Sequence, residues 1–290
     1  MDAASKIYVS GHKGMVGSAL VRALKLRGHT NLVLRSHSEL DLTDMAAVAR
    51  FFESEKPEYV FHPAGRVGGI LANSTYPADF LRDNLLMQMN VIHQAWVHKV
   101  NRLLYFGSSC IYPRDCPQPI KEDYFLTGPL EPTNSAYAIA KISGVEACRA
   151  YNQQHGTRFL AVMPTNLYGP NDHYDLQNSH VLPALIRKMH EAKIRGDNEV
   201  VIWGTGSPRR EFLHVDDLTN ACMLLANLSE TDFDKLIAGW QYPLVNIGCG
   251  EDSTIAELAM LVAMTVDFTG TLRYDIGKPD GTPQKLCDVS

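Results

Sequence analysis

The sequence lacks the features that mark several large classes of protein. It has no run of five like charges, and 27 Lys and Arg residues against 32 Asp and Glu give a net charge of −5, so we expect no nucleic-acid partner. It has neither an N-terminal signal peptide nor an apolar stretch long enough to cross a bilayer. Its six cysteines form no C-x-x-C pair, and no cluster of His, Cys and carboxylate side chains stands at metal-ligand spacing. We therefore expect a cytoplasmic protein with reduced thiols, no metal site and no membrane partner.

Short apolar runs alternate with longer helical patterns along most of the chain. Hydrophobic residues make up 45% of the 290 residues, enough for one large domain or for two lobes that share a cleft. Because parallel strands need a crossover, usually a helix, this order predicts an α/β fold with a doubly wound parallel sheet of the Rossmann type. The expected strands cover residues 7–10, 31–34, 59–62, 103–106, 159–163 and 199–203, and the longer expected helices cover residues 77–98, 135–155 and 181–195.

Residues 11–17, with the sequence GHKGMVG, join the first expected strand to the first expected helix. Glycines at such a junction let the backbone turn tightly and approach a diphosphate, whose charge then meets the amides and positive dipole at the helix start. A glycine string alone is also typical of an ordinary tight turn, but its place between a strand and a helix favours a dinucleotide site. The expected cofactor contacts in this loop are Gly11, Lys13, Gly14, Met15, Val16 and Gly17.

The end of the second expected strand distinguishes NAD from NADP. An acidic residue there binds the ribose 2′-hydroxyl of NAD, whereas an arginine accommodates the 2′-phosphate of NADP. This chain has Arg35 at that position, and Lys13 in the glycine loop is a second cation within its reach. We therefore predict NADPH as the cofactor; the alternative is that Arg35 is a solvated surface charge.

The domain organisation follows from the same patterns. No internal repeat, low-complexity tract or linker divides the chain, but proline and glycine become denser after residue 164. We expect residues 1–168 to form the NADP-binding Rossmann domain, to which segments at about 210–230 and 244–248 return. Residues 169–290 are expected to form mainly a smaller, discontinuous C-terminal lobe for the substrate.

Tyr137 and Lys141 stand four residues apart, and so on one face of the helix expected over residues 135–155. A tyrosine titrates near pH 10, so it works as an acid or base near neutrality only if a close cation and hydrogen bonds stabilise its phenolate. Ser108 follows the strand expected over residues 103–106, at the sheet edge where α/β folds bind ligands. We predict a ketone reductase in which Ser108 holds the carbonyl oxygen, Tyr137 donates a proton and the cofactor supplies hydride. The alternative is a solvated Tyr–Lys pair on a helix surface.

A further signal lies in five longer strings: residues 66–70 (RVGGI), 107–113 (GSSCIYP), 163–170 (MPTNLYGP), 178–181 (NSHV) and 210–217 (REFLHVDD). With the glycine loop and the Tyr–Lys pair, they resemble the extended short-chain dehydrogenases/reductases that act on nucleotide sugars, and more narrowly the GDP-L-fucose synthase family. The resemblance extends from about residue 6 to the last residue. It implies an NADPH-dependent enzyme that inverts carbons 3 and 5 of a GDP-linked 4-keto-6-deoxy sugar and then reduces carbon 4.

The same resemblance implies catalytic roles for individual residues. Ser108, Tyr137 and Lys141 would form the reductase site, and Cys110 and His180 the acid/base pair for epimerisation. The chemistry is consistent, because a C–H bond next to a ketone is acidified when its removal gives an enolate, and a thiol near positive charge can act as the base. From the sequence alone, Cys110 is more often a buried small hydrophobe and His180 an ordinary hydrogen-bonded histidine.

The resemblance also implies binding residues and an assembly. Cations and an aromatic wall would hold the GDP moiety, for which the alternatives are surface charges and core packing. A homodimer would form through the helices over residues 77–98 and 135–155. Because the family usually continues into another helical segment, we expect the substrate lobe to be incomplete at the C-terminus. The implied contacts are Asn166, Lys188, Trp203, Arg210 and Lys278 for the sugar nucleotide, and Asp41, Leu42, Ala64 and Lys141 for the cofactor.

Two other interpretations remain open. One is a nucleotide-sugar 4-epimerase or 4,6-dehydratase with bound NAD, although the dehydratases use an acidic pair where Ser109 and Cys110 stand here. The other is a non-catalytic, cofactor-sensing protein of the same fold, which would not need Ser108, Tyr137 and Lys141. Firmly bound NAD and no consumption of NADPH would favour either of them.

Overall fold

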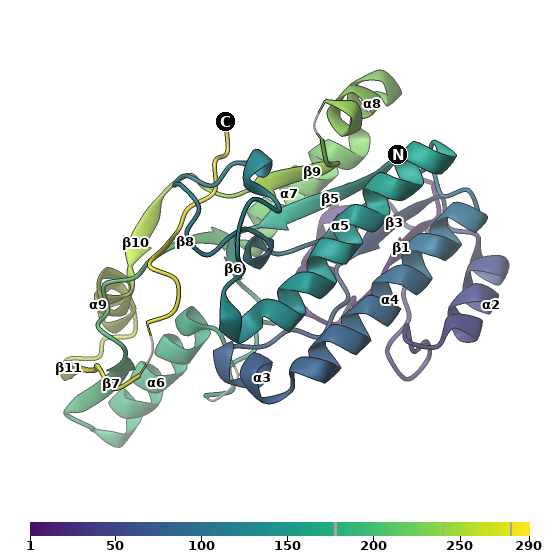
Figure 1. Cartoon of the computed structure of the whole chain (residues 1–290). Helices are drawn as coiled ribbons and strands as arrows, with labels where there is room; N and C mark the ends of the chain where they lie inside the picture. The colour runs from purple at the N-terminus through teal and green to yellow at the C-terminus, as the bar shows by residue number, and fades with distance from the viewer. Residues whose placement is uncertain (177–178, 240, 279) are drawn as a thin grey trace.

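A parallel sheet with the strand order β2-β1-β3-β4-β5-β9 forms the larger part of the molecule (Figure 1). The computed structural model describes residues 1–176, 179–239, 241–278 and 280–290. The predicted doubly wound parallel sheet is confirmed, although the second strand is shorter than the expected 31–34. The strands of this sheet are β1 (Ile7–Val9), β2 (Leu32–Val33), β3 (Tyr59–His62), β4 (Arg102–Phe106), β5 (Phe159–Pro164) and β9 (Leu244–Ile247).

Helices cover both faces of the sheet because the side chains of its strands alternate between two apolar cores. In β4, Leu103 and Tyr105 belong to the core on one face, and Leu104 and Phe106 to the core on the other. The first core is closed by α2 (Met45–Glu55), α4 (Pro77–Val97) and α5 (Ser135–His155), and the second by α1 (Met15–Leu26) and α7 (Val215–Asn227).

Helix ends follow local signals in the sequence. Gly28 adopts a φ of +84° just after α1, a conformation that glycine takes without steric cost. Asp44 caps α2 by accepting a hydrogen bond of 3.0 Å from the amide of Ala47. Both signals are local, because each acts over only a few residues.

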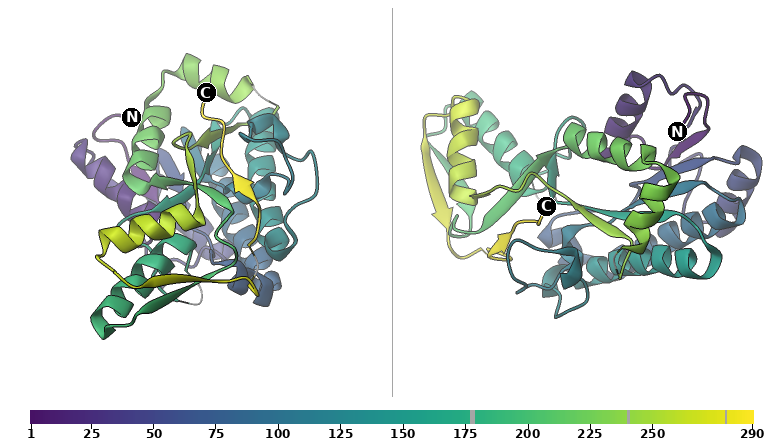
Figure 2. Two further views of the ribbon diagram at one scale, coloured as in Figure 1. Left: turned by 90° about the vertical axis from the view of Figure 1, so that its left-hand side faces the viewer. Right: turned by 90° about the horizontal axis from the view of Figure 1, so that it is seen from above.

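A smaller lobe lies beside the sheet and is assembled from segments that are far apart in the sequence (Figure 2). Its centre is β8 (Arg209–His214), which pairs with β6 (Asn166–Tyr168), β10 (Asp252–Thr254) and β12 (Gln284–Lys285). Strands β7 (Glu199–Trp203) and β11 (Thr271–Asp275) form a second, parallel pair. Helices α6 (Val181–Arg195) and α9 (Ile255–Thr265) share an apolar core with β7.

The remaining elements connect these layers. Of the segments expected to return to the cofactor domain, α7 packs against α1 and β9 closes the edge of the large sheet, whereas β8 lies in the smaller lobe. No helix within the described ranges is long and apolar enough to span a membrane. The other elements are α3 (Ile70–Thr75), α8 (Glu230–Ala238) and the short 3₁₀ turns η1 (Ser109–Ile111), η2 (Glu122–Tyr124) and η3 (Pro132–Asn134).

Candidate active site

The glycine loop between β1 and α1 has the geometry of an anion cradle. Gly11 adopts a φ of +59°, and a Cβ atom at residue 17 would lie 2.2 Å from the Gly11 carbonyl oxygen, so both positions require glycine. Gly14 is the N-cap of α1, and within the described ranges no side chain caps this helix start. Ala64 lies beneath the loop, 3.1 Å from the position of a Cβ on Gly11. The cradle therefore fits the diphosphate of a dinucleotide.

The region after β2 brings Arg35 close to carboxylates that sequence reasoning did not consider. The Arg35 guanidinium donates to Glu55 at 2.5 Å and to the carbonyl of Leu34 at 2.9 Å. Glu39 also lies near Arg35 and Lys13, and the pKa of its carboxyl is lowered first by hydrogen bonds from Ser36 and then by these two cations. For Arg35 to bind a 2′-phosphate, its guanidinium would have to leave Glu55.

Two further residues expected at the cofactor lie in the turn that leads from β2 to α2. Asp41 accepts hydrogen bonds from the amide and hydroxyl of Thr43, which lower the pKa of its carboxyl. Leu42 is buried, and its carbonyl accepts a hydrogen bond of 2.9 Å from the side chain of Asn90. Hydrogen bonds within the turn and from Asn90 on α4 thus hold the turn in place.

The predicted reductase residues lie together at the carboxyl end of β4. Burial raises the pKa of the Tyr137 phenol, and a hydrogen bond with the Ser108 hydroxyl opposes this. The Lys141 ammonium donates to the carbonyl of Phe106 at 2.9 Å and lies 5.8 Å from the centre of the Tyr137 ring. Burial lowers the pKa of Lys141 to about 8. The sequence predicted a phenolate stabilised by a close cation, but here burial dominates, so the phenol stays protonated near neutral pH and can act as an acid toward a bound carbonyl.

Cys110 lies in the turn η1, two residues after Ser108, and is buried. Its amide approaches the Ser108 hydroxyl at 3.5 Å, and its thiol also bonds to this hydroxyl. Burial raises the pKa of the thiol, which is opposed first by the charge of Lys285 and more weakly by Lys141. The thiol thus lies beside the reductase residues, within reach of the charges of Lys285 and Lys141.

His180 is the N-cap residue of α6. Although much of its surface is exposed, protein surrounds the ring, and this loss of solvent lowers the pKa of the imidazole; the charge of Asp172 opposes the shift. Lys285 acts on His180 as well as on Cys110. The charge of Lys285 therefore reaches both residues predicted for epimerisation. Asn178, which belongs to the same sequence string as His180, lies outside the described residues.

Three of the residues predicted to bind the sugar nucleotide form one cluster on the smaller lobe. Trp203 is 48% exposed, and the ammonium groups of Lys188 and Lys278 lie 5.3 and 5.2 Å from the centre of its rings. This arrangement offers an aromatic face and two positive charges to a nucleotide. Within the described ranges, no group of three or more His, Cys, Asp or Glu residues is placed to hold a metal ion.

The other two predicted residues lie nearer the large sheet. Asn166 donates to the carbonyl of Glu211 at 2.9 Å. Arg210 donates to the carbonyl of Arg209 at 2.7 Å, and burial lowers the pKa of its guanidinium against the opposing charge of Asp280.

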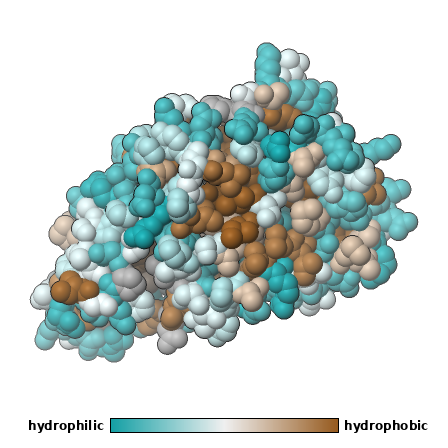
Figure 3. All heavy atoms as spheres, viewed as in Figure 1, coloured by the Kyte–Doolittle hydropathy of each residue, from teal (hydrophilic) through white to brown (hydrophobic). Residues whose placement is uncertain are grey.

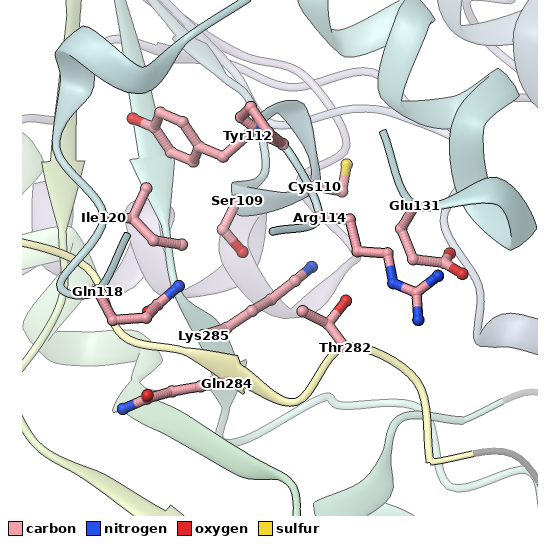
Figure 4. Close-up of a pocket in the computed structure, with 11 residues that line it drawn as sticks. Ser109, Cys110, Tyr112, Arg114, Gln118, Ile120, Glu131, Thr282, Gln284 and Lys285 are labelled. Atoms are coloured by element: carbon pink, nitrogen blue, oxygen red, sulfur yellow. The ribbon is translucent and has the colours of Figure 1, made fainter. Parts of the chain in front are cut away.

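A pocket opens beside Cys110, and Figure 4 shows the residues that line it. Ser109 and Cys110 come from η1, whereas Thr282, Gln284 and Lys285 come from the last ten residues of the chain. Sequence reasoning missed Lys285 because no motif or spacing connects it to the catalytic strings. Lys285 reaches the site only through the tertiary structure, in which β12 pairs with β8 and Lys285 lies opposite Arg210.

Comparison with known proteins gives consistent matches. The model of the NAD dependent epimerase/dehydratase family matches residues 7–237. GDP-L-fucose synthase 1 from Arabidopsis thaliana is 57% identical over 100% of this chain and 86% of its own, and GDP-L-fucose synthase from Escherichia coli is 49% identical over 98% and 88%. A GDP-D-glycero-L-gluco-heptose synthase from Campylobacter jejuni, solved in the presence of NADPH, superposes with a TM-score of 0.92 at 39% identity, covering 100% of this chain and 92% of its own. The chain therefore belongs to the NAD dependent epimerase/dehydratase family and groups there with the GDP-L-fucose synthases.

Proposed function

We propose that this protein converts GDP-4-keto-6-deoxy-D-mannose to GDP-L-fucose, by epimerisation at carbons 3 and 5 followed by reduction of the carbon 4 ketone with NADPH. The observation that carries the proposal is that Ser108 lies beside both Tyr137 and Cys110, because this places groups for reduction and for proton abstraction in one site. The glycine cradle and the GDP-L-fucose synthases among the relatives support the same conclusion.

Epimerisation needs a base, an acid and a stabilised enolate. Hydrogen bonds from Ser108 and Tyr137 would hold the ketone oxygen and stabilise the enolate that forms when a proton leaves carbon 3 or carbon 5. The Cys110 thiolate would take that proton, and protonated His180 would return one to the opposite face, which inverts the carbon. The lowered pKa of His180 makes its protonated form the stronger acid.

Reduction then uses the same carbonyl. NADPH, when bound, supplies hydride to carbon 4. Tyr137 would donate its proton to the carbonyl oxygen as the alcohol forms, and its raised pKa keeps that proton available near neutral pH. Lys141, fixed to the backbone of Phe106, would supply positive charge beside the phenol.

In this proposal, each of the two lobes binds one of the two nucleotides. The large sheet and its helices would hold NADPH through the glycine cradle. The smaller lobe would hold GDP, with Trp203 against the base and Lys188, Arg210 and Lys278 as counter-charges for the diphosphate. A point charge at Lys188 fits a diphosphate without the two-pronged geometry of an arginine.

We further infer a cytoplasmic homodimer. Free cysteines at all six positions are typical of a reducing compartment. Apolar residues on the outer surfaces of α4 and α5, among them Leu86, Met89 and Ile139, are 36–48% exposed. Figure 3 shows a hydrophobic area over these helices, and such a patch is typical of an interface between subunits.

The test is incubation of the protein with the GDP-linked keto sugar and NADPH in deuterated water, followed by identification of the product. GDP-L-fucose with deuterium at carbons 3 and 5 is the expected result. A product reduced at carbon 4 but without deuterium at carbons 3 and 5 would show that the protein is a ketone reductase without epimerase activity. Bound NAD with no NADPH consumption would favour a 4-epimerase or dehydratase. Cys110→Ser should abolish the deuterium incorporation; unimpaired exchange would reject the thiolate base.

A further inference from the structure

Lys285 lies at the centre of the pocket beside Cys110, although the proposed chemistry assigns it no role. Its strand, β12, pairs in parallel with β8, with Lys285 opposite Arg210. Figure 4 shows the Lys285 side chain extending between Ser109 and Thr282 toward the side of the pocket that holds Cys110. We propose that Lys285 is a positioning residue for epimerisation, whose ammonium stabilises the Cys110 thiolate and so determines how much of this base is available. The inference rests on the proposed function, in which Cys110 removes the substrate proton.

The Lys285 ammonium is available for this role because no short contact among the described residues commits it to another group. Among the described residues, it has neither a hydrogen-bond acceptor nor an ion-pair partner, although the side chain is half-buried. By contrast, the Lys141 ammonium is committed to the carbonyl of Phe106 at 2.9 Å. A poorly solvated cation favours an anion beside it, and Cys110 acts on Lys285 more strongly than the carboxylate of Glu131, which lines the same pocket.

The electrostatic effects of the two groups on each other have the required signs. Burial raises the pKa of the Cys110 thiol, and Lys285 is the strongest charge that opposes this. Burial lowers the pKa of Lys285, and Cys110 is the strongest charge that opposes that shift. The groups facing Cys110 are Lys285, Lys141, Ser108, Tyr137 and Tyr105. Those facing Lys285 are Cys110, Arg210, Glu131, Cys287, Cys116 and His180.

The same ammonium also acts on the opposite partner of the reaction. Lys285 lowers the pKa of His180, in addition to the larger effect of burial. One cation therefore favours the charged form of the base and makes the protonated acid more ready to give up its proton. A second cation at Arg210, opposite Lys285 in register, donates instead to the carbonyl of Arg209 at 2.7 Å.

The chain holds Lys285 in place through hydrogen bonds on the residues that follow it. The amide of Leu286 donates to Gln118 at 2.9 Å, and the Leu286 carbonyl accepts from the amide of Ile120 at 2.7 Å. The amide of Cys287 donates to the buried carboxylate of Glu211 at 2.9 Å. The side chain of Lys285 is therefore presented to the pocket from a fixed backbone, as a positioning role requires.

The test measures the Cys110 thiol directly in the full chain, without substrate. Wild type, Lys285→Met and Lys285→Arg are treated with iodoacetamide over a range of pH, and alkylation of the Cys110 peptide is quantified by mass spectrometry. We expect Lys285→Met to move the alkylation midpoint at least one pH unit higher, which makes the reaction about tenfold slower at neutral pH. In Lys285→Arg, which keeps the positive charge, the midpoint should lie close to that of wild type. Lys121→Met, which removes an exposed lysine, should match wild type.

The outcomes separate this inference from the proposed function. An unchanged midpoint in Lys285→Met, with NADPH binding and the urea unfolding midpoint preserved, would overturn the role of Lys285. Lys285→Gln is measured in parallel, so that poor folding of one variant does not decide the matter. Continued deuterium exchange in Cys110→Ser would overturn the proposed base while leaving the measured thiolate stabilisation intact.

Discussion

At the scale of single residues, we expect Tyr137 to be required for turnover. Burial raises the pKa of its phenol, so the proton needed for ketone reduction is present at neutral pH. Tyr137→Phe removes this proton and leaves Lys141 in place, and we expect kcat for NADPH consumption to fall about 100-fold or more while NADPH still binds. Tyr151→Phe, on the same helix, removes a hydroxyl bonded to His93 at 2.8 Å and is the matched control. A Tyr137→Phe enzyme with normal turnover would remove this residue as the proton donor.

His62 provides a test of stability against pH. Its side chain is fully buried beneath the cofactor loop, Nδ1 lies 2.8 Å from the Ser10 hydroxyl, and burial lowers the pKa of the ring to about 3. The folded protein keeps this ring neutral, whereas the unfolded chain takes up a proton below about pH 6.5. Each pH unit lost between about 6.5 and 3 therefore lowers the free energy of unfolding by about 1.4 kcal/mol through this group.

The prediction concerns the difference between wild type and His62→Leu. As the pH falls from 6.5 to 4.5, the free energy of unfolding of wild type should fall, relative to that of His62→Leu, by about 1.4 kcal/mol per pH unit. Urea unfolding of both proteins over this pH range measures the difference. His190→Leu, at an exposed histidine, is the matched control. A difference that stays constant with pH would contradict the neutral, buried state of His62.

Residues that act within a local motif could be predicted from the sequence, whereas residues that act through distant contacts could not. Ser108, Cys110, Tyr137 and Lys141 come together because a strand end and a helix start, both recognisable in the sequence, meet at one edge of the sheet. The ion pair of Arg35 with Glu55 and the position of Lys285 depend on tertiary packing, which no short spacing encodes.

At the scale of elements, the final strand β12 is held by one buried carboxylate. Glu211 is fully buried and accepts hydrogen bonds from the amides of Cys249, Gly250 and Cys287 at 2.6, 2.8 and 2.9 Å. The carboxylate fits because residue 248 is glycine, where a Cβ would lie 2.2 Å from a Glu211 oxygen. One side chain thus joins the loop after β9 to the segment that follows Lys285.

We expect Glu211→Gln to loosen this junction, because an amide group brings N–H donors toward backbone N–H donors. The free energy of unfolding should fall by about 2–4 kcal/mol, and the amides of residues 286–288 should exchange faster with deuterium. Glu257→Gln, which alters an exposed capping box at the start of α9, should cost about 1 kcal/mol or less. Equal losses in the two variants, without faster exchange, would contradict the anchoring role of Glu211.

At the scale of the whole molecule, the large sheet was predictable, whereas the strand pairing around β8 in the smaller lobe was not. In the large sheet, β1, β2 and β3 are each followed directly by an α-helix, and β4 is followed by α5 after three short 3₁₀ turns. This alternation along the sequence was enough to predict parallel order. The smaller lobe joins strands near residues 166, 210, 252 and 284, and each of these is too short to signal its partners. We propose that this discontinuous construction keeps the substrate lobe beside the carboxyl ends of the large sheet.

The proposed homodimer is a property of the molecule as a whole and can be tested by introducing charge on α4. Leu86→Arg with Met89→Arg places two cations in the apolar face over α4 and α5 and alters no residue of the candidate active site. In sedimentation velocity, wild type should behave as a particle of twice 32.2 kDa and the double variant as one of 32.2 kDa. Leu224→Arg, a 68% exposed position on α7 across the sheet, controls for the added charge and should leave the dimer intact. A double variant that keeps the wild-type mass would place the subunit interface on another face.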